Sequence, residues 1–263
     1  MGIIYAITLF VFGLIIGSFS NVIIHRLPKN ESIVSPGSKC PKCDHKIKWY
    51  DNVPLISYLF LGGKCRNCHT RISLRYPLVE GLMGLLYLFS YQWIGLGVPL
   101  IFTILFITIG IILIFIDLDY LIIPDVFVIS ILGVGIANLI YIWINQGGEK
   151  VFSYLLGMVF GFFLLLLVRV AGYAYYKREA LGLGDVKLMG ASGLFLGLEK
   201  ILLTILVASI IGAVVESISI ALKFKKKDTE IPFGPYLIIG LFISLFFGKV
   251  IIDWYIGFFW ELM

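Results

Sequence analysis

The stretch PLIFTILFITIGIILIFIDLDYLIIPD, residues 99–125, decides the fold class of this chain. Its first part, Pro99 to Ile116, contains no charged residue, and the acidic segment Asp117-Leu118-Asp119 follows directly. A transmembrane helix needs roughly 20 predominantly apolar residues, and fewer where protein surrounds it. The stretch therefore predicts a membrane-spanning helix that ends in ionisable side chains.

The composition of the whole chain also indicates a membrane protein. Of its 263 residues, 60% are hydrophobic and 14% are charged, and the mean hydropathy is +1.00. A soluble domain is typically about 45–50% apolar and about 25% charged, so the excess of apolar side chains must face lipid. This excludes a disordered chain, a collagen-like fibre and a secreted disulfide mini-protein. We predict an all-α polytopic membrane protein.

Apolar stretches along the chain predict about eight transmembrane helices. They cover residues 3–24, 77–94, 99–116, 124–144, 151–176, 186–196, 201–222 and 232–259. The sixth is short and contains glycine, so we expect neighbouring helices to shield it. The eighth is interrupted by Gly248, Lys249 and Asp253, which leaves two shorter pieces as an alternative. Basic residues follow the first stretch rather than precede it, which favours an uncleaved anchor over a signal peptide.

The basic residues predict the orientation, because cytoplasmic loops carry an excess of Lys and Arg. Residues 25–76 contain ten Lys or Arg and three acids, so this loop is predicted to be cytoplasmic. With eight spans, the loops at 117–123, 176–185 and 223–231 fall on the same side, and both termini lie outside. The basic residues in these loops support that side: Lys177, Arg178, Lys223, Lys225, Lys226 and Lys227.

All four cysteines lie in the loop 25–76, as Cys40-Pro-Lys-Cys43 and Cys65-Arg-Asn-Cys68. Each CxxC turn presents two thiolates, and two such turns suit one tetrahedral Zn²⁺. The loop is too polar to build a core alone, so the metal would supply most of its folding energy. The alternative is a pair of disulfides, which a cytoplasmic location disfavours. Topology already requires the basic excess, so we expect no nucleic-acid partner.

Two acidic motifs carry the remaining chemistry. Asp117 ends the third span, and Asp185 follows Gly182-Leu183-Gly184 before the sixth; the predicted topology places both at the cytoplasmic face. Two carboxylates that share a site can hydrolyse a peptide bond without metal, because repulsion keeps the pair singly protonated. The two glycines would let a substrate backbone approach. Asp119 would be solvated or orienting, and Asp185 could instead be only a helix-start acid.

These motifs, taken in order, resemble the bacterial type IV prepilin peptidases, also called leader peptidase/N-methyltransferases, among the GxGD intramembrane aspartyl proteases. The resemblance includes the cysteine pairs, both aspartate motifs and three further segments: Gly17 to Pro28, Arg75 to Glu80 and Pro232 to Tyr236. It implies Asp117 and Asp185 as the catalytic pair. It also implies supporting roles for Gly182, Gly184, Asp119 and Lys187.

The resemblance further implies what the chain acts on. Members cut prepilin leaders after a Gly on the cytoplasmic side of the bacterial inner membrane, and many then N-methylate the new amine with S-adenosylmethionine. In the family, the Gly-Lys pair before the third cysteine is tied to methyl transfer, which points here to Gly63 and Lys64. The substrates would be subunits of type IV pili, type II secretion or a competence pseudopilus. The implied divisions are a first helix at 1–24, the zinc loop at 25–76 and a peptidase core at 77–263.

Two other classes of protein remain open from the residues alone. A transporter or channel with a metal-sensing loop would use the intramembrane acids as a proton relay, and Glu216 in mid-span would then matter as much as either aspartate. A non-enzymatic scaffold would dock partners through the zinc loop, but it leaves the aspartate pair unexplained.

Overall fold

The computed structural model describes residues 2–177, 181–223 and 232–262, and most of them are helical. The only β-type pairings among them are two isolated bridges, so the all-α prediction is confirmed. The chain divides into two compact units, residues 1–112 and 113–263, and the boundary falls within one helix, α4 (Val98–Tyr120). Four basic residues used to predict the orientation lie outside the described residues: Arg178, Lys225, Lys226 and Lys227.

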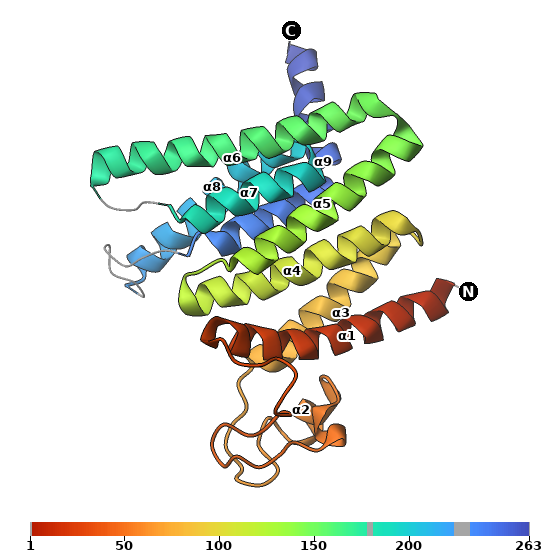
Figure 1. The fold of residues 1–263 in the computed structure, drawn as a ribbon, viewed down its shortest axis with the longest axis vertical. Coiled ribbons are helices and arrows are strands. Elements are labelled where there is room, and N and C mark those ends of the chain that lie inside the picture. Colours follow the sequence, from red (N-terminus) through yellow and green to blue (C-terminus); the bar gives the residue numbers. More distant parts are fainter. Residues whose placement is uncertain (1, 178–180, 224–231, 263) are drawn as a thin grey trace. The chain divides into compact units, whose positions relative to one another are not determined.

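The first unit is a helix pair that carries the cysteine loop. Helix α1 (Gly2–Arg26) packs along α3 (Arg75–Ile94), and the loop lies beyond one end of this pair (Figure 1). The two backbones approach closely, since a Cβ added at Gly13 would lie 2.7 Å from the Gly84 Cα. Small residues permit such contacts between membrane helices. The loop contains three short helices: η1 (Leu27–Lys29), η2 (Trp49–Asn52) and α2 (Ile56–Phe60).

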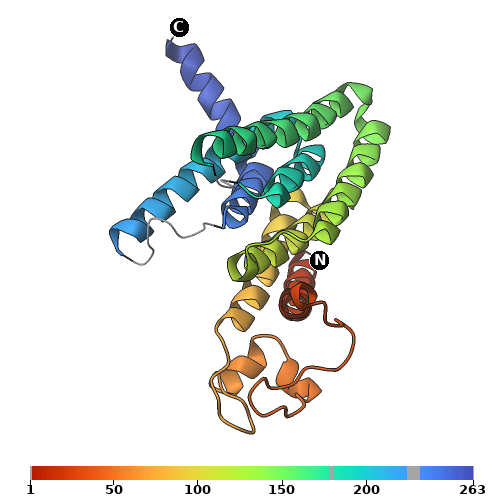
Figure 2. The same ribbon diagram turned by 60° about the vertical axis from the view of Figure 1, so that its left-hand side comes forward.

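The second unit is built around a short buried helix, α7 (Leu183–Leu196). Its neighbours are α5 (Asp125–Gln146), α6 (Gly148–Tyr176), α8 (Leu198–Ala221) and α9 (Gly234–Leu262). Figure 2 shows α7 alongside α6, where a Cβ added at Gly193 would meet the backbone of Gly157. Every residue of α7 from Val186 to Leu196 is buried except Lys187. The prediction that neighbouring helices shield this stretch is therefore confirmed.

Among the described residues, six helices are long and apolar enough to cross a membrane: α1, α4, α5, α6, α8 and α9. Large apolar side chains on them are exposed, as at Ile3 and Leu167, which suits a surface in contact with lipid. The chain is therefore a multi-pass membrane protein. Each predicted span corresponds to a helix, but α3 and α7 fall outside the set of six, so the count of eight stays a prediction.

The last span is one continuous helix, and the alternative of two pieces is wrong. Gly248 does not interrupt it. A Cβ added at Gly248 would lie 3.2 Å from Cγ of Lys200, so the glycine makes room for that side chain of α8. The Lys200 Nζ donates a hydrogen bond to the backbone carbonyl of Leu245, over 3.3 Å. The glycine thus serves helix packing.

Candidate active site and metal centre

The two aspartates predicted as catalytic lie together in the second unit. Asp117 belongs to the last turn of α4, and Asp185 belongs to the first turn of α7. Both residues are buried, with only 6% of Asp117 and 7% of Asp185 exposed. The charge of Asp117 acts directly on Asp185. Two carboxylates this buried and this close resist simultaneous ionisation. Two buried carboxylates within electrostatic reach of each other are an arrangement that could carry out acid–base hydrolysis of a peptide bond.

Asp117 is held by the start of the last helix. The backbone N–H of Gly234 donates a hydrogen bond to Asp117 Oδ2 over 3.1 Å. A Cβ added at Gly234 would lie only 2.6 Å from that oxygen. Sequence reasoning assigned no role to Gly234, although the glycine between Pro232 and Pro235 marks an unusual helix start. The first turn of α9 presents unpaired N–H groups, which favour a carboxylate there.

Asp185 has one oxygen engaged and one available. The backbone N–H of Gly182 donates a hydrogen bond to its carboxylate, and a Cβ added at Gly182 would lie 3.1 Å from Oδ2. Oδ1 is buried and has no hydrogen-bond partner among the described residues. Buried acceptors of this kind are uncommon in proteins and often mark a functional site. An oxygen in this state can accept a hydrogen bond from a water molecule or a substrate.

Gly184 packs against the segment that follows Asp117. A Cβ added there would lie 2.8 Å from Cβ of Ile123, in the connection between α4 and α5. The position where a side chain would begin is therefore occupied by the protein, while the glycine itself remains partly exposed. The contact brings the start of α7 against the segment that follows Asp117.

Other polar contacts brace the two aspartate segments. Lys187 Nζ and Asp125 Oδ1 form an ion pair of 2.8 Å between the first turns of α7 and α5. Arg169 Nη1 donates a hydrogen bond to the carbonyl of Leu181 over 2.7 Å, which holds the residue before Gly182 to α6. Sequence reasoning missed this function of Arg169. Asp119 is exposed, as expected for a solvated or orienting residue.

Glu216 is engaged by a neighbouring helix. It is buried on α8, and its Oε1 accepts a hydrogen bond of 2.7 Å from the Tyr236 hydroxyl on α9. Hydrogen bonds between side chains of neighbouring membrane helices contribute to helix association. This contact gives Glu216 a structural role in the second unit.

The four cysteines form a site that fits a metal ion. Their sulfur atoms all lie within 4.8 Å of one another, and Cys40 Sγ is 3.8 Å from Cys68 Sγ. A tetrahedral Zn²⁺ with Zn–S bonds of about 2.3 Å separates its sulfurs by about 3.8 Å. All four thiols are free, and this spacing far exceeds the roughly 2.05 Å of a disulfide. The structure therefore contradicts the disulfide alternative.

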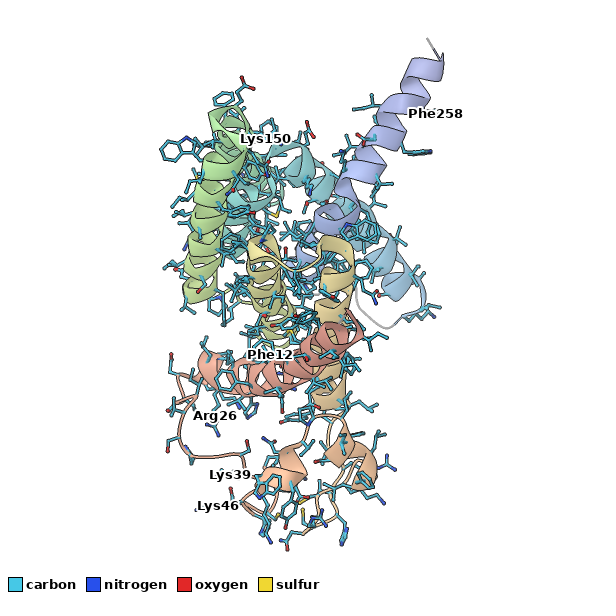
Figure 3. The ribbon with its side chains drawn as sticks, turned by 90° about the vertical axis from the view of Figure 1, so that its right-hand side faces the viewer. Phe12, Arg26, Lys39, Lys46, Lys150 and Phe258 are labelled. Carbon is cyan, nitrogen blue, oxygen red and sulfur yellow. The ribbon has the colours of Figure 1, made fainter. Side chains whose placement is uncertain are left out.

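Two matching turns build this metal centre. In each, the first cysteine's N–H bonds the carbonyl five residues on, from Cys40 to His45 and from Cys65 to Thr70. Figure 3 shows Lys39 and Lys46 in the loop, where they form the bridge that closes the first turn. A hydrogen bond with Thr70 lowers the pKa of Cys68 to about 6, which favours the thiolate that a metal requires.

A further ion pair holds the metal loop. The Arg66 guanidinium donates to both carboxylate oxygens of Asp51, at 2.6 to 3.0 Å, and this keeps the pKa of Asp51 below its ordinary value. Bidentate pairs of this kind fix orientation as well as distance. His45 and His69 are exposed, and neither belongs to the cluster of four cysteines that could hold a metal ion.

Gly63 and Lys64 lie just before the second cysteine turn. Gly63 is buried with φ +67°, and a Cβ added there would lie 2.8 Å from the Tyr58 hydroxyl. Glycine is therefore required both by the backbone conformation and by the tyrosine. Lys64 is exposed and pairs through its backbone with Arg71.

Comparisons with known proteins match both units. Residues 11–94 match the model of the bacterial peptidase A24 N-terminal domain, and residues 104–216 match that of the type IV leader peptidase family. The first range contains the four cysteines and the second contains both aspartates. No solved structure matches the chain.

Several curated relatives bear the name prepilin leader peptidase/N-methyltransferase. One from Pseudomonas aeruginosa is 35% identical over 94% of this chain and 91% of its own length. One from Legionella pneumophila is 35% identical over 94% of this chain and 93% of its own. One from Myxococcus xanthus is 40% identical over 81% of this chain, and the match spans 63% of that relative. These matches give no support to the transporter or channel alternative.

Proposed function

The chain belongs to the type IV leader peptidase family, and on that premise we propose that it cleaves prepilin leader peptides and N-methylates the new amino terminus. The observation that carries the peptidase is the buried pair of Asp117 and Asp185, which lie within electrostatic reach of each other. We assign both residues to catalysis. Gly182, Asp119 and Lys187 are supporting residues, and Gly184 supports the site through its contact with Ile123.

Hydrolysis by this pair needs one ionised and one protonated carboxyl group. The ionised group removes a proton from a water molecule as the water oxygen bonds to the scissile carbonyl carbon. The protonated group donates its proton to the carbonyl oxygen. The C–N bond then breaks as the leaving amine takes the proton that came from water. The hydroxyl group made from the carbonyl oxygen returns its proton to the aspartate that donated it, so the carboxyl product forms and the pair is restored. The apparent pKa values belong to the pair rather than to either residue.

The proposed location is the bacterial inner membrane, with the cysteine loop and both aspartates at the cytoplasmic face and both termini outside. The excess of basic residues in segment 25–76 supports this orientation. A prepilin would keep its apolar helix in the bilayer while its leader meets the aspartates on the aqueous side. In functional terms we divide the chain into a first helix (1–24), the metal loop (25–76) and the peptidase core (77–263).

The methyltransferase half of the proposal involves the metal loop and S-adenosylmethionine. Cys40, Cys43, Cys65 and Cys68 would hold Zn²⁺, because their thiolates and spacing suit a closed structural site. S-adenosylmethionine, when bound, supplies an electrophilic methyl group on a sulfonium. Gly63 and Lys64 lie next to the metal loop's second turn, and we place them with methyl transfer.

One incubation tests both activities. Purified protein in detergent is mixed with a synthetic prepilin and S-adenosylmethionine, and the product is followed by intact-mass spectrometry. We expect loss of the leader and gain of one methyl group. Asp117→Asn and Asp185→Asn should abolish cleavage, whereas Glu149→Gln, at an exposed acid in the first turn of α6, should not. Full leader removal by either aspartate variant would overturn the peptidase assignment.

A further inference from the structure

A cavity of about 890 Å³ lies within the first unit, between the cysteine loop and the adjoining ends of α1 and α3. Its walls come from three places in the chain. Ser18 and Asn21 lie on α1, Glu80 lies on α3, and Leu55 and Tyr58 come from the loop. Small-molecule sites usually have volumes of about 300–1,000 Å³. The cavity is therefore large enough for a cofactor-sized ligand.

Asn21 lines this cavity and carries a buried acceptor without a partner among the described residues. The residue is 4% exposed, and its Nδ2 donates hydrogen bonds to the carbonyls of Gly17 and Tyr76, at 3.3 and 3.2 Å. These two acceptors determine the amide orientation, since a flipped amide would place its oxygen against two carbonyl oxygens. Oδ1 is buried and has no hydrogen-bond partner among the described residues. A ligand that donates a hydrogen bond would satisfy it.

Glu80 places a carboxylate in the same wall. It is 8% exposed, and its Oε2 accepts a hydrogen bond of 2.9 Å from the Leu55 N–H, with a second bond from the Ser18 side chain. These contacts fix the carboxylate between α1, α3 and the loop. A carboxylate that has lost most of its water favours a ligand that carries positive charge.

Basic side chains complete the lining. Arg26, Lys39 and Arg71 reach the cavity from the loop side, and Figure 3 shows Arg26 and Lys39 at the end of α1 and in the loop. The cavity therefore offers a buried carboxylate, an unused amide oxygen and several cations. Cys40 and Cys65 also line it, so the metal centre shapes one wall.

We propose that this cavity binds S-adenosylmethionine, with Asn21 and Glu80 as binding residues. The assignment rests on the proposed N-methyltransferase activity and locates its methyl donor. S-adenosylmethionine combines two cationic groups, a carboxylate and the hydrogen-bond donors of adenosine. This combination matches a lining that holds acceptors, negative charge and basic groups together. Nothing in the proposal requires the aspartates of the second unit.

Ligand binding by the full-length, zinc-loaded protein in detergent tests this assignment. Isothermal titration measures the affinities for S-adenosylmethionine and for the product S-adenosylhomocysteine, which lacks the sulfonium charge. Asn21→Leu and Glu80→Gln should each weaken the binding of S-adenosylmethionine at least about 10-fold. Glu80→Gln keeps an acceptor for the Leu55 N–H, and it should reduce the preference for the sulfonium ligand over the thioether.

Matched controls come from the same two helices. Ser20 on α1 and Ser90 on α3 are fully buried, bond only to their own helix in the described contacts and do not line the cavity. Ser20→Ala and Ser90→Ala should therefore keep the parent affinity. Zinc content and prepilin cleavage, measured on every variant, show that the fold is retained.

The outcomes separate this assignment from the proposed function. If the parent protein binds the methyl donor and both cavity variants bind it equally well, the cavity assignment is wrong and the methyltransferase stands. If an active peptidase neither binds nor uses the donor, the methyltransferase function itself is wrong. If the variants lose affinity only for a mature pilin peptide, the cavity holds the methyl acceptor, which also overturns the assignment.

Discussion

The backbone N–H of Gly234 donates a hydrogen bond to Oδ2 of Asp117, and 117 positions of sequence separate the two residues. The last helix of the protein thus begins at one of the two acids. A carboxylate that accepts such a bond keeps a defined direction. The position of Asp117 therefore depends on α9 as much as on α4.

Gly234→Ala should disable cleavage. The new Cβ would lie 2.6 Å from Asp117 Oδ2, so the carboxylate must move, and a misplacement of about 1 Å can cost about 100-fold in rate. Leader removal, followed by mass spectrometry, is the measurement. Gly257→Ala on the same helix meets nothing within 4 Å and should retain parent activity. Equal activity of the two variants would show that the hydrogen bond does not position the acid.

Gly63→Ala should reduce methyl transfer and spare cleavage. Its Cβ would meet the Tyr58 hydroxyl at 2.8 Å and push this cavity-lining side chain, while Asp117 and Asp185 belong to the other unit. Methylation of an already cleaved pilin is measured beside leader removal. Gly62→Ala is a matched control, since Gly62 also has a positive φ, +56°, but nothing lies within 4 Å. The hypothesis fails if both substitutions reduce methylation equally.

Lys187→Met should have a small effect. The Lys187–Asp125 pair is partly exposed, and ion pairs of this kind contribute less than about 1 kcal/mol. We expect the denaturation midpoint to change little and cleavage to stay within about fivefold of the parent. A loss of 100-fold or more would contradict a bracing role and indicate direct contact between Lys187 and the substrate.

Removal of the metal should affect methylation more than cleavage. Cys40 lines the proposed donor cavity, so Cys40→Ser with Cys43→Ser should disrupt that wall, whereas the aspartates lie in the other unit. The double variant should lose zinc and S-adenosylmethionine binding and keep most of its leader removal. A complete and equal loss of both activities, in protein shown to be folded, would count against this modularity.

The metal site shows what the spacing of sequence motifs alone can predict. Two CxxC motifs each confine a pair of thiols within one turn, so a single metal centre followed from local geometry and from the chemistry of the thiolate. Asn21 shows the limit. The carbonyls of Gly17 and Tyr76 accept hydrogen bonds from its side-chain nitrogen, and this fixes the amide with its oxygen pointing away from them. That oxygen has no partner among the described residues, and Tyr76 lies 55 residues away in the sequence. No local pattern contains that contact.

The sequence by itself determined the helices, the membrane character, the cysteine site and the identity of the acidic motifs, because hydropathy and motif spacing are local properties. Only the tertiary structure decided what each glycine faces. Gly184 meets Ile123, Gly248 meets Lys200 and Gly234 meets Asp117. A glycine has no side chain whose chemistry could indicate a role. Its role therefore depends on which distant group packs against it, and only the tertiary structure shows that group.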